Sequence, residues 1–124
     1  MQLYASSKVM VVSLPDRWVL ASSDLNARAR ILEVAGTAEV VMTGPTGFRP
    51  QLTTTSLLIL DLDEGGLEAL GELGEARGAG EGPADVVGFL SHVDRELGRA
   101  AREAGCRAVA RGRFWTHLRE ELGA

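Results

Sequence analysis

The 124 residues predict one α/β domain, in which a parallel sheet carries helices on both faces. The first observation is the run Leu57-Leu58-Ile59-Leu60, which has no polar residue and therefore suits a strand buried on both sides. The second is that segments of strand and helix character alternate along the chain. The third is a hydrophobic content of 45% with 24% charged residues, which is ordinary for a globular domain.

The first predicted unit is a strand followed by a helix. Trp18–Ala21 is a short apolar strand, and Ser22-Ser23-Asp24 ends it with residues that favour helix N-caps. Leu25–Ala35 follows as a helix, because its apolar residues recur at helical spacing. Gly36 supplies a stop.

The middle of the chain predicts a shortened second helix before the central strand. Ala38–Met42 is a strand, and the glycines and prolines of 43–50 then indicate a loop. Residues 51–56 leave space for only about one helical turn. The central strand, 57–62, leads through a glycine bend into a helix over Leu67–Ala76, with Leu67, Leu70 and Leu73 facing the sheet.

The last third predicts two further strand–helix units. Asp85–Leu90 is an apolar strand, and the spacing of Val93, Leu97, Ala100 and Ala104 is that of an amphipathic helix. Residues 107–110 form a fifth strand, 111–113 a turn, and 114–122 a C-terminal helix.

Five such units suit a three-layer αβα arrangement with the flavodoxin-like strand order 2-1-3-4-5. Residues 17–124 would form this domain, and residues 1–16 an N-terminal extension or an extra strand. No apolar run approaches the roughly 18 residues that span a bilayer. With a single cysteine, Cys106, no internal disulfide is possible, and we expect a cytoplasmic protein.

The charge pattern argues against direct nucleic-acid binding. The net charge is −4, and no basic stripe stands out. Arg95, Arg99 and Arg102 could lie along one helix, but Glu96 and Glu103 are interleaved with them, which favours a solvated helix face.

Polar residues follow four of the predicted strands at the point where each strand ends. Parallel strands of the predicted order bring these ends to one edge of the sheet, where such folds place their ligand crevices. The residues expected there are Ser22, Ser23, Asp24, Asp61, Asp63, Ser91, His92, Arg111 and Arg113.

This ordered set, over Trp18 to Leu122, resembles the receiver domain of two-component response regulators, and the chain looks like a degenerate member. The resemblance implies a phosphoacceptor at Asp61, within the apolar-Asp-apolar pattern of 57–62. It further implies phosphoryl contacts from Ser91 and from Arg111 or Arg113. It implies a possible Mg²⁺ site, whose ligands would be Asp24, Asp61 and Asp63.

The chain departs from the receiver pattern at two important positions. The usual acid pair falls on Ser22-Ser23, with Asp24 one residue late, and no lysine follows the fifth strand. Without a metal, a phosphoryl group near Asp61 would face like charge, which costs roughly 4 kcal/mol per pair of unit charges at ~4 Å and an effective dielectric of ~20. We therefore expect weak phosphorylation of Asp61 or none.

The resulting prediction is a stand-alone receiver-like signalling module that acts through protein–protein interaction, is not an enzyme and requires no cofactor. Its partner would be a histidine kinase or a downstream effector, with no membrane contact. The helix over 93–104, the strand over 107–110 and the C-terminal helix would form the contact surface, which could also support a homodimer. Two alternatives stay open: a conventional Mg²⁺-dependent phosphoacceptor, and a small ligand-binding or enzymatic α/β domain using the same crevice. Asp61 could also simply cap the turn that follows it.

Overall fold

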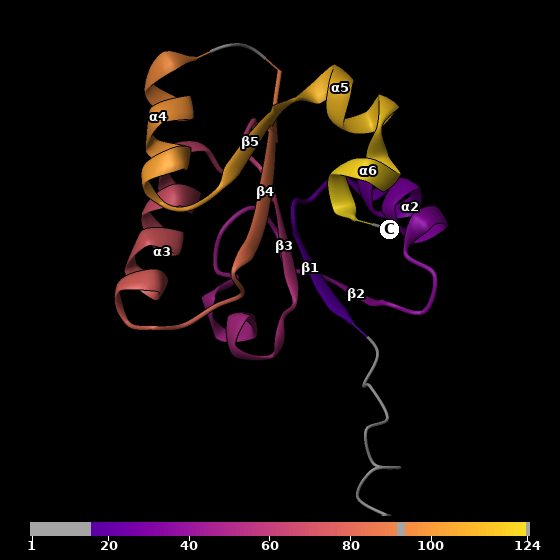
Figure 1. Ribbon diagram of the computed structural model, residues 1–124, viewed down its shortest axis with the longest axis horizontal. Coiled ribbons are helices and arrows are strands. Elements are labelled where there is room, and N and C mark those ends of the chain that lie inside the picture. The colour runs from indigo at the N-terminus through magenta and orange to yellow at the C-terminus, as the bar shows by residue number, and fades with distance from the viewer. Residues whose placement is uncertain (1–15, 92–93, 124) are drawn as a thin grey trace, which may run out of the picture.

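A five-stranded sheet lies between two layers of helices in the computed structural model, which describes residues 16–91 and 94–123 (Figure 1). All four strand pairs are parallel. The strand order is β2-β1-β3-β4-β5, so the predicted fold class and the predicted order 2-1-3-4-5 are confirmed. The strands are β1 (Arg17–Ala21), β2 (Glu39–Met42), β3 (Leu57–Asp61), β4 (Asp85–Leu90) and β5 (Arg107–Ala110).

Helices α3 and α4 cover one face of the sheet, and α2, α5 and α6 cover the other (Figure 1). The predicted shortening of the second helix is confirmed, because the segment before β3 forms only a 3₁₀ helix, η1. The helices are α2 (Leu25–Val34), η1 (Arg49–Thr54), α3 (Gly66–Gly78), α4 (Arg95–Glu103), α5 (Arg111–Thr116) and α6 (Leu118–Leu122).

The central strand β3 supplies side chains to two separate apolar cores. Leu58 and Leu60 pack beneath α3 and α4, whereas Leu57 and Ile59 pack beneath α2, α5 and α6. All five residues of β3 are buried. Because each fully buried aliphatic side chain contributes about 1.5–3 kcal/mol, this strand fixes the position of the carboxylate at its end, Asp61.

Gly88 in β4 is required by close packing under α4. A Cβ atom at this position would lie 2.7 Å from Leu62 Cδ1 and 3.0 Å from Cys106 Sγ. Cys106 is buried, as a small apolar residue would be, and burial raises the pKa of its thiol to about 12.

The C-terminal segment differs from its sequence prediction. The expected turn at 111–113 is instead the first turn of α5, and the expected single helix is divided at His117. His117 has φ −116° and ψ 39°, outside the helical region. Leu67 also departs from its expected place on the sheet, because it lies at the start of α3 and is 50% exposed.

Residues 1–15 lie outside the described part of the chain, so the predicted N-terminal extension or extra strand stays a prediction. His92, Val93 and Ala124 also lie outside it. Of the helices in 16–91 and 94–123, none combines the length and the apolar character that crossing a membrane demands.

Candidate functional site

Most of the polar residues predicted to meet at one edge of the sheet do meet there, except that Arg113 lies elsewhere and His92 is outside the described residues. Ser22, Ser23 and Asp24 follow β1, Asp61 ends β3, and Ser91 follows β4. Arg111 begins α5 immediately after β5. We call this group, with Asp63 and Glu64 of the β3–α3 loop, the crevice cluster.

Asp61 is the buried member of the crevice cluster, with 4% of its surface exposed. Its Oδ2 accepts a hydrogen bond from Ser22 Oγ at 2.8 Å, and its Oδ1 accepts one from the backbone N–H of Glu64 at 3.3 Å. Burial raises the pKa of Asp61, because removal from water disfavours the charged form more than these hydrogen bonds favour it. Asp61 thus also caps the turn after β3, which is the structural role that the sequence analysis offered as an alternative.

Asp63 is more exposed and better paired. Its carboxylate accepts from Ser91 N at 2.7 Å, from Ser91 Oγ at 2.6 Å and from Arg111 Nη1 at 2.8 Å. Burial works to raise the pKa of Asp63, but the hydrogen bonds from Ser91 and Arg111 together outweigh burial and lower it. Ser91, predicted as a phosphoryl contact, is therefore already bonded to this carboxylate.

Arg111 lies among three carboxylates. Besides Asp63, its Nη1 is 3.9 Å from Asp61 Oδ1, and its Nη2 is 3.7 Å from Asp24 Oδ2. The guanidinium also lies over the ring of Phe89, 4.9 Å from its centroid, and Phe89 stacks on Phe114. The guanidinium of Arg111, stacked over the Phe89 ring, thus partly neutralises the negative charge of the crevice cluster.

Glu64 is a member of the cluster that the sequence analysis did not identify. Its carboxylate accepts from Ser23 N at 2.8 Å, from Ser23 Oγ, and from Ser22 Oγ at 3.3 Å. Hydrogen bonds from Ser23 lower the pKa of Glu64. The sequence did contain a signal for this role. Glu64 follows Asp61 by three residues, and Ser22 and Ser23 occupy the positions where the receiver pattern has acids, so a carboxylate from elsewhere could be expected beside them.

Two predicted residues have other partners. Arg113 lies next to Glu121, with Nε 3.3 Å from Oε2, because two residues along a helix turn a side chain about 200° away from Arg111. Asp24 caps α2, where its Oδ1 accepts from Asn26 N at 2.9 Å.

The donor set of the crevice cluster does not fit Mg²⁺. Mg²⁺ requires octahedral oxygen ligands at close range, usually with one or two carboxylates and several waters. Here Arg111 lies among the three predicted ligands, and Ser22 and Ser23 supply hydroxyls bonded to Asp61 and Glu64. Within the described ranges, no group of three or more His, Cys, Asp or Glu side chains is arranged to hold a metal ion.

Comparison with known proteins supports the fold. No protein-family model and no curated protein sequence matches the chain. A solved structure of a CheY-like protein, TadZ from Pseudomonas aeruginosa PAO1, is similar to it with a TM-score of 0.56 and 19% sequence identity. The likeness covers 90% of this chain and 96% of that one, so the chain has the CheY-like fold throughout its described sheet and helices.

Proposed function

We propose that the chain is a receiver-like signalling domain that acts by binding other proteins and does not depend on phosphorylation of Asp61. The observation that carries this proposal is the position of Arg111. Its guanidinium is hydrogen-bonded to Asp63 and lies within 4 Å of carboxylate oxygens of Asp24 and Asp61. The crevice cluster thus contains its own cation.

The arrangement also opposes phosphoryl transfer to Asp61. The carboxylate is buried and bonded to Ser22, its pKa is raised, and Ser91 is bonded to Asp63. An incoming phosphoryl group would have to draw Arg111 away from Asp63 or meet the like charge of the carboxylates, at roughly 4 kcal/mol for each unit-charge pair at ~4 Å and an effective dielectric of ~20, of which Arg111 in its present position offsets only a part. Both routes raise the barrier to phosphorylation.

The proposal is tested with acetyl phosphate and Mg²⁺, with the intact mass of the protein as the readout. We expect no added phosphoryl group in the wild type or in Asp61→Asn, while a phosphorylatable receiver treated in parallel shows that the reagent is active. A Mg²⁺-dependent phosphoryl adduct on the wild type that Asp61→Asn lacks would establish the conventional phosphoacceptor instead.

Beryllofluoride gives a second readout that needs no phosphoryl transfer. We expect the backbone amide resonances of Ser22, Glu64 and Ser91 to stay in place when beryllofluoride and Mg²⁺ are added. Saturable shifts at these amides, absent from Asp61→Asn, would overturn the proposal.

A further inference from the structure

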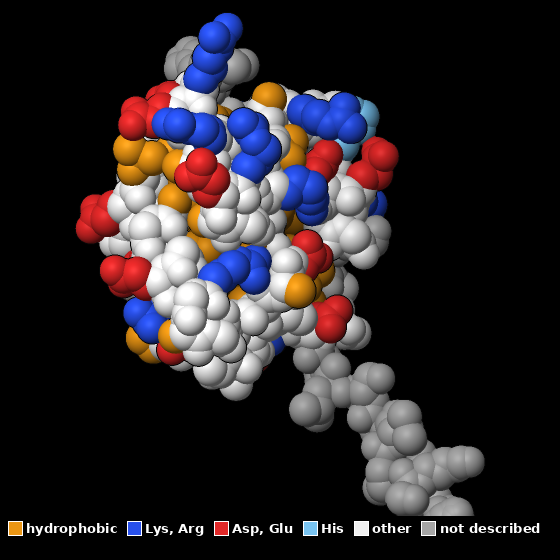
Figure 2. Space-filling model, turned by 60° about the vertical axis from the view of Figure 1, so that its left-hand side comes forward, with side chains coloured by type: hydrophobic (Ala, Val, Ile, Leu, Met, Phe, Trp, Pro, Cys, Tyr) orange, Lys and Arg blue, Asp and Glu red, His pale blue; other side chains and the backbone are white. Residues whose placement is uncertain are grey.

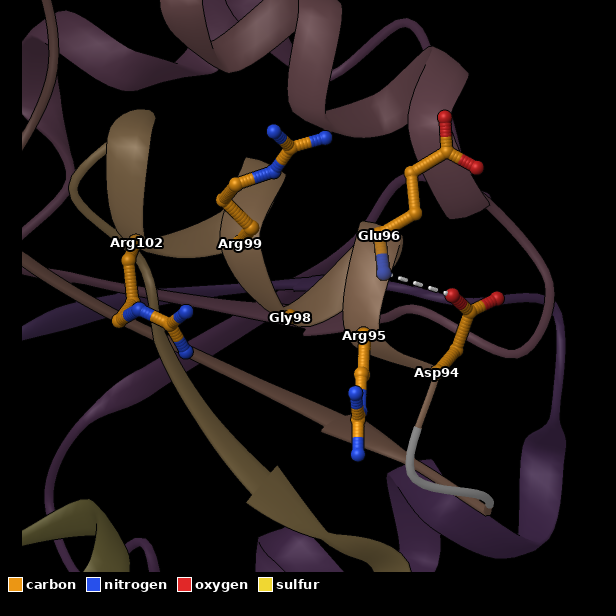
Figure 3. A pocket seen from close by; sticks show the side chains of 6 residues that line it. All are labelled: Asp94, Arg95, Glu96, Gly98, Arg99 and Arg102. Carbon is orange, nitrogen blue, oxygen red and sulfur yellow. Dashed lines mark hydrogen bonds between the residues drawn. The ribbon is translucent and has the colours of Figure 1, made fainter.

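Helix α4 carries three arginines on its outer face whose side chains bond no other described residue. Arg28 on α2 and Arg119 on α6 are likewise exposed and unbonded within the described residues, but each lies singly, whereas the three on α4 are clustered. Arg95, Arg99 and Arg102 are all exposed, and their spacing of four and three residues places their Cα atoms along one side of α4, from which the side chains diverge. We call these three residues the arginine face. Figure 3 shows Arg95 and Arg102 extending to one side of the helix with Gly98 between them, and Arg99 extending to the other side.

Most other arginines of the described chain are bonded within the molecule. Arg17 bonds Gln51 and Thr54, Arg49 bonds Glu81, and Arg77 bonds the carbonyls of Ala104 and Gly105. The remaining tied arginines are Arg30 on Trp115, Arg107 and Arg113 on Glu121, and Arg111 in the crevice cluster.

The arginine face has no such partner in 16–91 and 94–123. No carboxylate oxygen of these residues lies within 4.0 Å of the three guanidinium groups. Glu96 and Glu103 lie three residues before and four residues after Arg99 without pairing with it, and Figure 3 shows Glu96 pointing away from Arg95. Like charges at these spacings repel one another along the helix, so carboxylates supplied from outside the domain would relieve this repulsion.

The arginine face also borders a hollow. A groove of about 460 Å³ is lined by Asp94, Arg95, Glu96, Gly98, Arg99 and Arg102. Gly98 adds no side chain to the groove, although a Cβ there would meet only an ordinary van der Waals contact, 3.9 Å from Arg102 Nη1. On the side of the molecule formed by α3 and α4, basic side chains gather over the upper part, and acidic ones lie mostly toward the edges (Figure 2).

From this charge pattern we infer that the arginine face binds an acidic segment of a partner protein. Arg95 and Arg99 are separated by a rise of about 6 Å along the helix, and Arg95 and Arg102 by about 10.5 Å. Alternate side chains of an extended chain are about 6.6 Å apart, so a segment with Asp or Glu at every second position presents carboxylates at an interval close to the rise between Arg95 and Arg99. Each arginine then gains a carboxylate that the chain itself does not provide.

Two other occupants fit the arginine face less well. A symmetric pair of copies meeting through it would bring the three arginines of each copy together, so these charges weigh against the predicted homodimer through α4. Nucleic acid is a poorer fit because the protein has a net charge of −4. Its three clustered arginines could make fewer phosphate contacts than the roughly six to ten of strong DNA binders.

The inference deepens the proposed function, on which it rests for the premise that the domain acts through protein contact. It is tested by fluorescence anisotropy with a labelled short peptide of alternating Glu and Ser. We expect the wild type to bind the peptide at low salt and to release it at high salt, where the electrostatic screening length falls to ~3 Å. Arg95→Gln with Arg102→Gln should weaken binding about fivefold.

The matched control is Arg28→Gln with Arg119→Gln, which removes the same charge from exposed positions elsewhere, in α2 and α6. It should leave peptide binding within a factor of about two of the wild type. Equal weakening by both variant pairs would show that only net charge matters and would overturn the inference, as would absence of peptide binding by the wild type.

A third arm replaces the peptide with an oligothymidylate of equal charge. Tighter binding of the oligothymidylate through the same arginines would reassign the face to nucleic acid. None of these outcomes bears on the phosphorylation assay, so failure of the inference is distinct from failure of the proposed function.

Discussion

Arg111 and Arg99 belong to the same domain but have opposite surroundings. Arg111 lies over Phe89 and is hydrogen-bonded to Asp63, with two more carboxylates within 4 Å. Arg99 is exposed on α4 between two other arginines, with no described carboxylate in reach. The crevice cluster is therefore partly satisfied within the chain, whereas the arginine face depends on something outside it. Our two proposals follow this difference: the crevice cluster takes up no phosphoryl group, and the arginine face binds a partner.

The largest expected effect comes from removing the cation of the crevice cluster. Arg111→Ala leaves Asp61, Asp63 and Asp24 together without compensation, and it takes the guanidinium off Phe89. We expect a loss of about 2 kcal/mol in the free energy of unfolding, measured by urea denaturation. Arg111→Lys, which keeps a charge but not the planar fork, should lose about half as much. Equal stability of all three proteins would show that Arg111 does not hold the cluster.

The next effect comes from the better paired carboxylate. Asp63→Asn weakens the hydrogen bonds from Ser91 and Arg111, and we expect it to destabilise the protein by about 1 kcal/mol at neutral pH. Because the folded-state pKa of Asp63 is lowered, its contribution is present above the ordinary value of 3.8 and is lost as the pH falls through the folded value. The stability difference from the wild type should therefore shrink in acid.

Asp61→Asn should behave with the opposite sign. Burial raises the pKa of Asp61, so the folded protein loses stability as the pH rises from about 3.8 through the raised folded value. The asparagine variant lacks this loss and should be more stable than the wild type at pH 7, with the advantage fading below pH 3.8. Denaturation curves of both asparagine variants across this range check the pair. A destabilised Asp61→Asn would show that the Arg111 charge outweighs burial.

The smallest expected effect on stability is at the arginine face. Arg95→Gln with Arg102→Gln removes exposed charges that bond nothing in the described chain, so the free energy of unfolding should change by less than about 0.5 kcal/mol. The same variant is expected to bind the acidic peptide about fivefold more weakly. A loss of more than about 1 kcal/mol in the free energy of unfolding would mean that these arginines make stabilising contacts within the domain, as Arg77 does.

The sequence was sufficient to predict the features that depend on the course of the backbone, namely the strand order and the residues at the carboxyl ends of the strands. The apolar run of β3 and the alternation of strands and helices gave the parallel order, and that order alone brought Asp61, Asp63, Ser91 and Arg111 to one edge. Predicting that these residues lie together required no knowledge of side-chain conformation, because the carboxyl ends of parallel strands meet at one edge of the sheet when the connections are right-handed.

Side-chain direction was less accessible. Arg113 was expected at the crevice together with Arg111, but the immediate start of α5 turns it to Glu121. Glu64 reaches Ser22 and Ser23 through a loop conformation that no sequence periodicity encodes. The three arginines of α4 were visible in the sequence and were interpreted, with the interleaved Glu96 and Glu103, as a solvated helix face. That these glutamates do not pair with Arg99 depends on side-chain conformation, which the sequence does not reveal.

The most direct test of a crevice cluster closed by its own cation is a Mg²⁺ titration of the wild type and Arg111→Ala side by side, with Arg111→Met as a second variant that keeps the side-chain bulk. Melting temperature is measured against Mg²⁺ concentration at constant ionic strength. We predict no Mg²⁺-dependent rise for the wild type and a saturable rise for both variants, whose freed carboxylates attract the ion. A saturable rise in the wild type, abolished by Asp61→Asn, would contradict it.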